Sequence, residues 1–172
     1  MNISFEEYRA LRSKQRSASI SEGLEKSYQQ GMSKVANRKC FGYVTDAEGH
    51  LIIDPERAEI VHWIFDTFLS RISYGKIAAS LTEQGVLTAT GGSKWSSQAI
   101  KDLLSNEKYI GQVQLRKTVT VDSKQVVNDG QAEQFLYTDH HEPIISNEQF
   151  EAAQAEIARR AKSDGTIKQT LS

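Results

Sequence analysis

Residues 86–111 read VLTATGGSKWSSQAIKDLLSNEKYIG, a stretch that predicts a polar loop, a short capped helix and the entry to a strand. Ser96 stands at the N-cap position, where a serine oxygen accepts hydrogen bonds from the unpaired N–H groups of the first turn. Over residues 97–105, apolar side chains at helical spacing form one stripe for burial. These are Ala99, Ile100, Leu103 and Leu104. The opposite face carries Ser97, Gln98, Lys101 and Asp102.

Two interpretations of this helix are open. A short helix with hydrogen-bond donors and a cation on its free face has the right shape for the major groove of DNA. An ordinary surface helix with solvated polar side chains explains the same pattern. The helix alone favours the second interpretation, so the flanking sequence has to decide.

Two more helices are predicted just upstream. Asp54 can cap a helix whose first position is Pro55, where the missing N–H costs nothing. The apolar face that follows must be core: Ile60, Val61, Ile64, Phe65, Phe68 and Leu69. Ser73 can cap a shorter helix over residues 75–84, which Gly85 would end in a left-handed conformation. With helix 96–105, these form a helix-turn-helix-like trihelical core whose connecting loop is longer than in the simplest motif.

Short strands and a last helix are predicted around this core. A turn-rich interval between apolar residues predicts a hairpin over residues 41–53. Alternating apolar residues predict a strand over 112–121, and a second strand returns at 135–137 after a polar stretch that contains an Asn-Asp-Gly turn. A capping box at residues 146–149 starts a C-terminal helix. The expected fold class is α+β, a trihelical core with a small antiparallel β-sheet and a C-terminal helix.

The N-terminal region is charged and has few apolar anchors. Residues 4–16 are either a solvated helix or a frayed end, and a capping box at residues 19–22 predicts a helix through residue 30. The expected organisation is a helical arm over 1–31, a basic linker over 32–40, a folded domain over 41–162 and a disordered tail over 163–172.

Composition limits the function classes. The 172 residues carry a net charge of −1, but residues 73–120 hold six Lys or Arg against three Asp or Glu. This modest basic footprint is compatible with phosphate contact. No stretch approaches the ~20 apolar residues of a membrane span. Cys40 is the only cysteine, which excludes disulfides and cysteine-based zinc sites within the chain and favours a reducing cytoplasm.

Catalytic and metal-binding patterns are weak. The sequence Asp139-His140-His141-Glu142 offers metal-ligand chemistry, but adjacent histidines on an extended chain point to opposite sides, so a polar connection is the favoured interpretation. The Gly-Gly-Ser-Lys run at 91–94 lacks the spacing of a phosphate-binding loop. We therefore expect no catalytic residue, no cofactor and no metal site in this chain, and no enzymatic activity of its own.

Several segments, in this order, resemble the recombinase domain of large serine recombinases, which are phage-type integrases and related transposases. They are FGYV, DPERAEIVHWIFDTFLS, SYGKIAASLTEQGV, GGSKWSSQAIKDLLSNEKYIG and HHEPIISNEQFEAAQ. The resemblance spans roughly residues 19–162. In that family a catalytic domain with a nucleophilic serine precedes this domain, and a zinc ribbon follows it. The resemblance therefore implies a DNA-binding fragment of a site-specific recombinase whose catalytic serine lies outside this chain.

The resemblance also implies where DNA is contacted. It places the loop 88–95 and the helix 96–105 in the DNA-reading segment and lays the basic linker along the DNA. The expected DNA-binding residues are Arg38, Lys39, Thr88, Thr90, Lys94, Ser96, Ser97, Gln98 and Lys101. Gln98 suits an adenine edge, Ser97 and Lys101 read or steer nearby, and Lys94 and the linker cations hold phosphates.

Some positions near this segment have other roles or depart from the family. Trp95, just before the N-cap, is expected to pack as a hydrophobic staple rather than to touch DNA. Proline and arginine often occur in the family where this chain has Ala89 and Thr90, and proline often occurs near residues 107–108. Without the arginine, a lower affinity or a different DNA sequence is expected, because arginine is the usual reader of guanine.

Three functions follow from the sequence. The favoured one is sequence-specific binding of double-stranded DNA at a recombination attachment site, in the integration or excision of mobile DNA. The alternatives are a stand-alone helix-turn-helix regulator and a protein-interaction module. We expect double-stranded DNA as the partner, no membrane association, a cytoplasmic location and a largely monomeric state in isolation, with oligomers forming on DNA only within a full-length recombinase.

Overall fold

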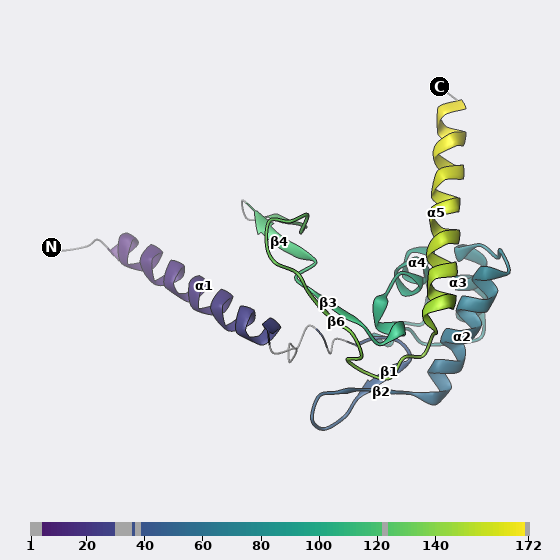
Figure 1. The fold of residues 1–172 in the computed structure, drawn as a ribbon, viewed down its shortest axis with the longest axis horizontal. Coiled ribbons are helices and arrows are strands. Elements are labelled where there is room, and N and C mark those ends of the chain that lie inside the picture. The colour runs from purple at the N-terminus through teal and green to yellow at the C-terminus, as the bar shows by residue number, and fades with distance from the viewer. Residues whose placement is uncertain (1–4, 30–35, 37–38, 122–123, 171–172) are drawn as a thin grey trace. The chain divides into compact units, whose positions relative to one another are not determined.

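The structure, a computed structural model, describes residues 5–29, 36, 39–121 and 124–170 (Figure 1). These residues form two compact units. One joins the N-terminal residues up to Ala36 with Gln114–Tyr137, and the other joins Asn37–Val113 with Thr138–Ser172. We call them the arm unit and the helical unit. The basic linker predicted over 32–40 lies largely outside the described residues.

The helical unit begins with a hairpin and three helices. Strands β1 (Tyr43–Thr45) and β2 (Leu51–Ile53) pair antiparallel, with Tyr43 opposite Ile53. Helices α2 (Pro55–Leu69), α3 (Tyr74–Glu83) and α4 (Ser97–Leu104) follow, and each packs against the other two. The short 3-10 helix η1 (Glu107–Ile110) comes next, and α5 (Asn147–Thr170) closes the unit against α2. The α+β fold with a trihelical core is therefore confirmed.

The predicted caps explain where these three helices begin. The side chain of Asp54 accepts a hydrogen bond from the Arg57 N–H at 3.3 Å, and Ser73 does the same for Lys76. Ser96 Oγ accepts from the Ala99 N–H at 3.1 Å. Each bond satisfies a donor that has no partner inside its helix. Gly85, with φ of +71°, adopts the left-handed conformation predicted after α3.

One hydrophobic core holds the helical unit together. Val61, Ile64, Phe65 and Phe68 of α2 are fully buried. Tyr109 of η1 lies among them, and its hydroxyl donates to the Phe41 carbonyl at 2.8 Å. The apolar face predicted for α2 is therefore the centre of the core, and α3 and α4 pack against it.

The arm unit consists of one long helix and short antiparallel strands. Helix α1 (Phe5–Gln29) contacts the strands through Glu25, which accepts from Arg116 at 3.2 Å, and through Tyr28. Strand β3 (Val113–Leu115) pairs with β6 (Phe135–Tyr137). Strand β4 (Thr118–Val121) pairs antiparallel with β5 (Lys124–Val127).

Four sequence predictions are corrected here. Helix α1 is continuous, so the capping box at 19–22 lies inside it, because no proline interrupts the segment. The strand predicted over 112–121 is broken at Arg116, whose φ is +63°. Strand β5 forms within the polar stretch before residue 135, where no strand was predicted. Helix α5 continues to Thr170, through residues expected to be disordered.

Asn128 explains the break between β3 and β4. Its side chain is buried and donates to the carbonyls of Arg116 and Ala132 at 2.8 and 2.7 Å. Its backbone N–H donates to the Lys117 carbonyl at 2.8 Å. A buried amide that satisfies carbonyls on both sides of the bend holds the chain in this turned conformation.

Candidate nucleic-acid interface

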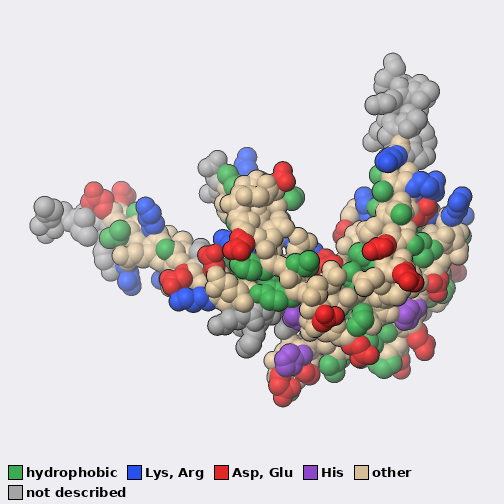
Figure 2. Space-filling model, in the orientation of Figure 1, with side chains coloured by type: hydrophobic (Ala, Val, Ile, Leu, Met, Phe, Trp, Pro, Cys, Tyr) green, Lys and Arg blue, Asp and Glu red, His purple; other side chains and the backbone are tan. Residues whose placement is uncertain are grey.

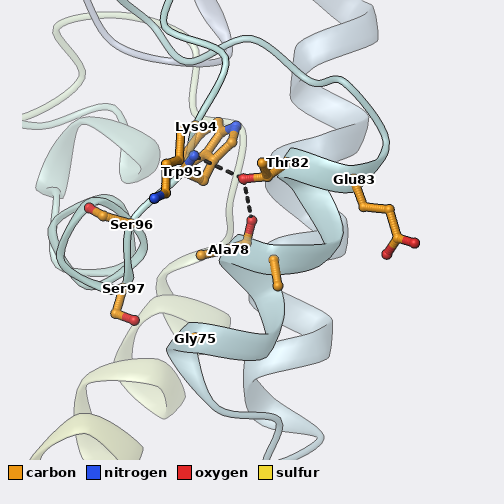
Figure 3. Close-up of a pocket in the computed structure, with 9 residues that line it drawn as sticks. Gly75, Ala78, Thr82, Glu83, Lys94, Trp95, Ser96 and Ser97 are labelled. Carbon is orange, nitrogen blue, oxygen red and sulfur yellow. Dashed lines mark hydrogen bonds between the residues drawn. The ribbon is translucent and has the colours of Figure 1, made fainter.

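Trp95 anchors the loop that leads into α4. Its side chain is only 5% exposed, its indole Nε1 donates to the Val86 carbonyl at 2.8 Å, and its ring meets Phe41 edge-on at 5.1 Å. The Trp95 N–H donates to Thr82 Oγ1 at 3.0 Å, and that hydroxyl donates in turn to the Ala78 carbonyl (Figure 3). The loop is thereby fixed to α3, and the prediction that Trp95 packs inside is confirmed.

Residues 88–92 form a compact turn before Trp95. The Thr88 N–H donates to the Gly92 carbonyl at 2.8 Å, and Thr88 Oγ1 accepts from the Gly92 N–H at 2.9 Å. Gly91 has a φ of +84°, which glycine adopts without the steric cost of a Cβ. Thr90 is exposed at the tip of this turn. The turn thus presents a rigid polar edge to solvent.

Two grooves flank the loop 87–95. One, of about 520 Å³, lies between α3 and the start of α4, and we call it the α3–α4 groove. In Figure 3, the start of α4 with Ser96 and Ser97 lies opposite Gly75 and Ala78 of α3. The other, of about 470 Å³, lies between the loop and the β1–β2 hairpin, and we call it the hairpin groove. Small side chains on α3 leave the first groove open.

The structure distributes the predicted site residues over both grooves and the free face of α4. Lys94, Ser96 and Ser97 line the α3–α4 groove. Lys39, Thr88 and Thr90 line the hairpin groove. Gln98 and Lys101 are exposed on the outer face of α4. Arg38 lies outside the described residues. The eight described residues therefore border one loop and one helix.

The residues of the hairpin groove that sequence reasoning missed include Arg57 and Thr45. The guanidinium of Arg57 lies 5.8 Å from the centre of the Phe41 ring, and its Nε lies 3.5 Å from Asp54 Oδ2. A basic residue in the first turn of a helix opposes the helix dipole. That unfavourable placement is the only signal in the sequence that could have singled out Arg57.

The free face of α4 contains one side-chain pair. Gln98 Nε2 donates to Asp102 Oδ1 at 2.7 Å, and both side chains are exposed. Lys101 is exposed next to Asp102. Ser96 is already engaged as the N-cap of α4. The polar side chains that this face presents to solvent are those of Ser97, Gln98, Lys101 and Asp102.

The His140–His141 pair differs from its prediction. The two Nδ1 atoms lie 3.1 Å apart, whereas the sequence predicted rings on opposite sides. The reason is Asp139, whose φ of +55° bends the chain out of an extended conformation. His141 Nε2 lies 2.7 Å from the Lys108 carbonyl oxygen, and burial lowers the pKa of His141. The pair serves as a polar connection between η1 and the chain leading to α5.

Among the described residues, ligand-type side chains gather at the β1–β2 turn. Atoms of Asp46, Glu48 and His50 lie within 4.8 Å of one another, and acidic and histidine side chains cover this turn in Figure 2. Asp46 Oδ1 accepts from the His50 N–H at 2.7 Å, and this bond lowers the Asp46 pKa. That bond is a local lock of the hairpin turn, so the cluster has a structural explanation.

The comparison with known families covers the elements just described. A family model described as Recombinase matches residues 55–160, from the start of α2 into α5. This chain belongs to the recombinase family. The recombinase domain of the serine recombinase family, predicted from the order of motifs, is thereby confirmed, and the matched region contains both α4 and the loop before it.

Two solved structures are similar in fold to this recombinase-family chain. One, described as "Sequence Requirements of the Listeria innocua prophage attP site", is 24% identical with a TM-score of 0.51, over 82% of this chain and 52% of that one. The other, described as "Crystal Structure of a LSR-DNA Complex", is 26% identical with a TM-score of 0.47, over 73% and 33%. The chain thus spans about half and about a third of these proteins.

No helix among the described residues has both the length and the apolar character needed to cross a membrane.

Proposed function

We propose that this chain binds double-stranded DNA sequence-specifically at a recombination attachment site, as the recombinase domain of a serine recombinase that integrates or excises mobile DNA. The observation that carries the proposal is the division of α4 into two faces. Ile100 and Leu104 are fully buried, whereas Ser97, Gln98 and Lys101 are exposed. In a family that recombines DNA, such a helix on a trihelical core suits the major groove.

The dimensions of α4 agree with this role. An α-helix with its side chains is about 10–12 Å across, and the major groove of B-DNA is about 12 Å wide. The caps and buried side chains hold α4 rigidly on α2 and α3, so its polar side chains need little ordering on binding. A preorganised reading face of this kind lowers the entropic cost of recognition.

Cations on both sides of the loop 87–95 support contacts with phosphates. Lys94 is exposed at the rim of the α3–α4 groove, and Lys39 and Arg57 line the hairpin groove. Phosphate contacts position a protein on DNA, while base contacts specify the sequence. We therefore assign these three cations and Lys101 to the phosphate backbone, and Ser97 and Gln98 on the outer face of α4 to the bases. The serine that cuts DNA belongs, in this proposal, to a separate domain of the recombinase.

The salt dependence of binding tests the assignment of lysines. We expect Lys94→Ala and Lys101→Ala each to lower the slope of log affinity against log salt by about one if they meet phosphate. The measurement is fluorescence anisotropy with a duplex that the chain enriches from a pool with a randomised core of about 20 base pairs. Lys124→Ala, on the exposed strand β5, is the matched control and should leave the slope unchanged.

Two results would contradict the proposal in different ways. Failure of the chain to enrich any sequence, although it is folded, removes sequence-specific DNA binding. Enrichment of a sequence with unchanged slopes for both Lys94→Ala and Lys101→Ala removes the phosphate assignment of these lysines. Enrichment of a short palindrome by a tight dimer would instead favour the stand-alone regulator.

A further inference from the structure

Gln98 and Asp102 lie one turn apart on the exposed face of α4. The Gln98 Nε2 donates to Asp102 Oδ1 at 2.7 Å. An ionised carboxylate has no hydrogen to donate, so it accepts only from the amino end of the glutamine amide. The pair therefore fixes which way the amide is turned. Its Nε2 faces Asp102, and its Oε1 faces away.

We infer that Asp102 is a positioning residue that presents Gln98 for adenine, an inference that rests on the proposed function. Adenine offers the N7 acceptor and the N6 donor in the major groove, and the glutamine amide matches this pair with one N–H and its Oε1. In this role Asp102 would take the N–H trans to Oε1. The remaining N–H then lies on the same edge as Oε1, which is the edge that pairs with adenine.

The same orientation disfavours guanine. Guanine presents two acceptors, N7 and O6, in the major groove. With its amide held by Asp102, Gln98 offers one donor and one acceptor there, so Oε1 meets O6 acceptor against acceptor. Without Asp102, the amide is free to turn over and to donate alone to guanine or thymine. Asp102 thus limits the bases with which Gln98 can pair.

The charge of Asp102 gives the inference a second signature. An exposed carboxylate on a DNA-facing helix repels phosphates and weakens binding to every sequence. Replacing Asp102 by alanine therefore has two opposite effects. General affinity for DNA rises because a negative charge is lost, while preference for adenine falls because Gln98 is no longer held. If the pair only stabilised α4, replacing Asp102 would leave the base preference unchanged.

The test uses the 172-residue chain, the enriched duplex and duplexes that differ from it at one base pair. We expect Gln98→Ala to reduce the preference for adenine at one position at least about fivefold, the lower end for a bidentate contact. Asp102→Ala and Asp102→Asn should reduce the preference at that same position, and Asp102→Ala should also bind the non-preferred duplexes more tightly. In the double variant with Gln98→Ala, Asp102→Ala should cause no further loss of preference.

Glu83→Gln is the matched control. Glu83 is an exposed carboxylate at the rim of the α3–α4 groove, on α3 rather than on α4. Its replacement should raise general affinity without changing any base preference. Thermal unfolding of each variant verifies that the fold is retained.

The outcomes separate the inference from the proposed function. If the unaltered chain enriches a sequence and Asp102→Ala keeps the preference, the positioning role is overturned while DNA reading stands. The positioning role would also be overturned if Gln98→Ala removed a preference for a base other than adenine. If the unaltered chain enriches nothing, the proposed function fails and the inference fails with it.

Discussion

The two sides of the segment 86–105 differ in both chemistry and environment. On the inner side, Ile100 and Leu104 are fully buried against α2 and α3. On the outer side, Gln98 and Lys101 are exposed only one or two positions along the same helix. Because a helix separates its faces by 100° per residue, one short sequence supplies both an anchor and a recognition surface. Substitutions on the inner side should therefore change stability, and substitutions on the outer side should change binding alone.

Trp95→Ala should give the largest effect on the inner side. The variant loses a buried indole, its bond to the Val86 carbonyl and its contact with Phe41. We expect the free energy of unfolding to fall by about 3–5 kcal/mol, the usual cost of removing a buried tryptophan. Urea unfolding followed by circular dichroism measures it.

The second tryptophan provides the matched control. Trp63 on α2 is 37% exposed, so Trp63→Ala should cost clearly less than Trp95→Ala. Equal losses for the two variants would show that Trp95 does not anchor the loop, and the distinction between the two sides of the segment would lose its main support.

Ser96→Ala tests a residue that belongs to both sides. The serine is exposed, yet its Oγ caps α4 through the Ala99 N–H. We expect the free energy of unfolding to fall by about 1 kcal/mol, as for other N-cap serines. Ser96→Asp, which restores an acceptor, should recover most of it, whereas Ser97→Ala should have little effect. If Ser96→Ala proved neutral, α4 would be held by packing alone.

The local signals for helices were sufficient to predict much of the fold. The caps at Asp54, Ser73 and Ser96 and the apolar stripes behind them depend on residues three or four positions apart. They correctly predicted α2, α3 and α4, and the order of motifs predicted the family. The sequence therefore predicted the position of α4 at the edge of the core.

The features that the sequence did not predict depend on contacts between distant residues. Strand β5 is stabilised by pairing with β4, and the hairpin groove brings Arg57 near the loop at residues 87–91. At the capping box of α5, Ser146 caps as predicted, but the Gln149 side chain donates to Asp66 on α2 at 2.7 Å. A partner 83 positions away thus replaced the local one, and no local pattern reports such a choice.

The pH dependence of stability should give the smallest effect, and it acts on the buried side. His141 packs edge-on against Tyr43 with ring centres 4.8 Å apart, and its pKa is lowered mainly by burial. The unfolded chain therefore takes up a proton at about pH 6.5, whereas the folded chain does so only at lower pH. Stability should be highest above pH 6.5 and should fall as the pH decreases toward the folded pKa.

His141→Asn should remove this loss of stability between pH 7 and pH 5. His50→Asn, at the exposed hairpin turn, should show the same loss as the unaltered chain. Chemical unfolding at each pH measures the free energy of unfolding of each variant. If His141→Asn kept the full pH dependence, another group would be responsible, and the connection behind η1 would not be sensitive to protonation.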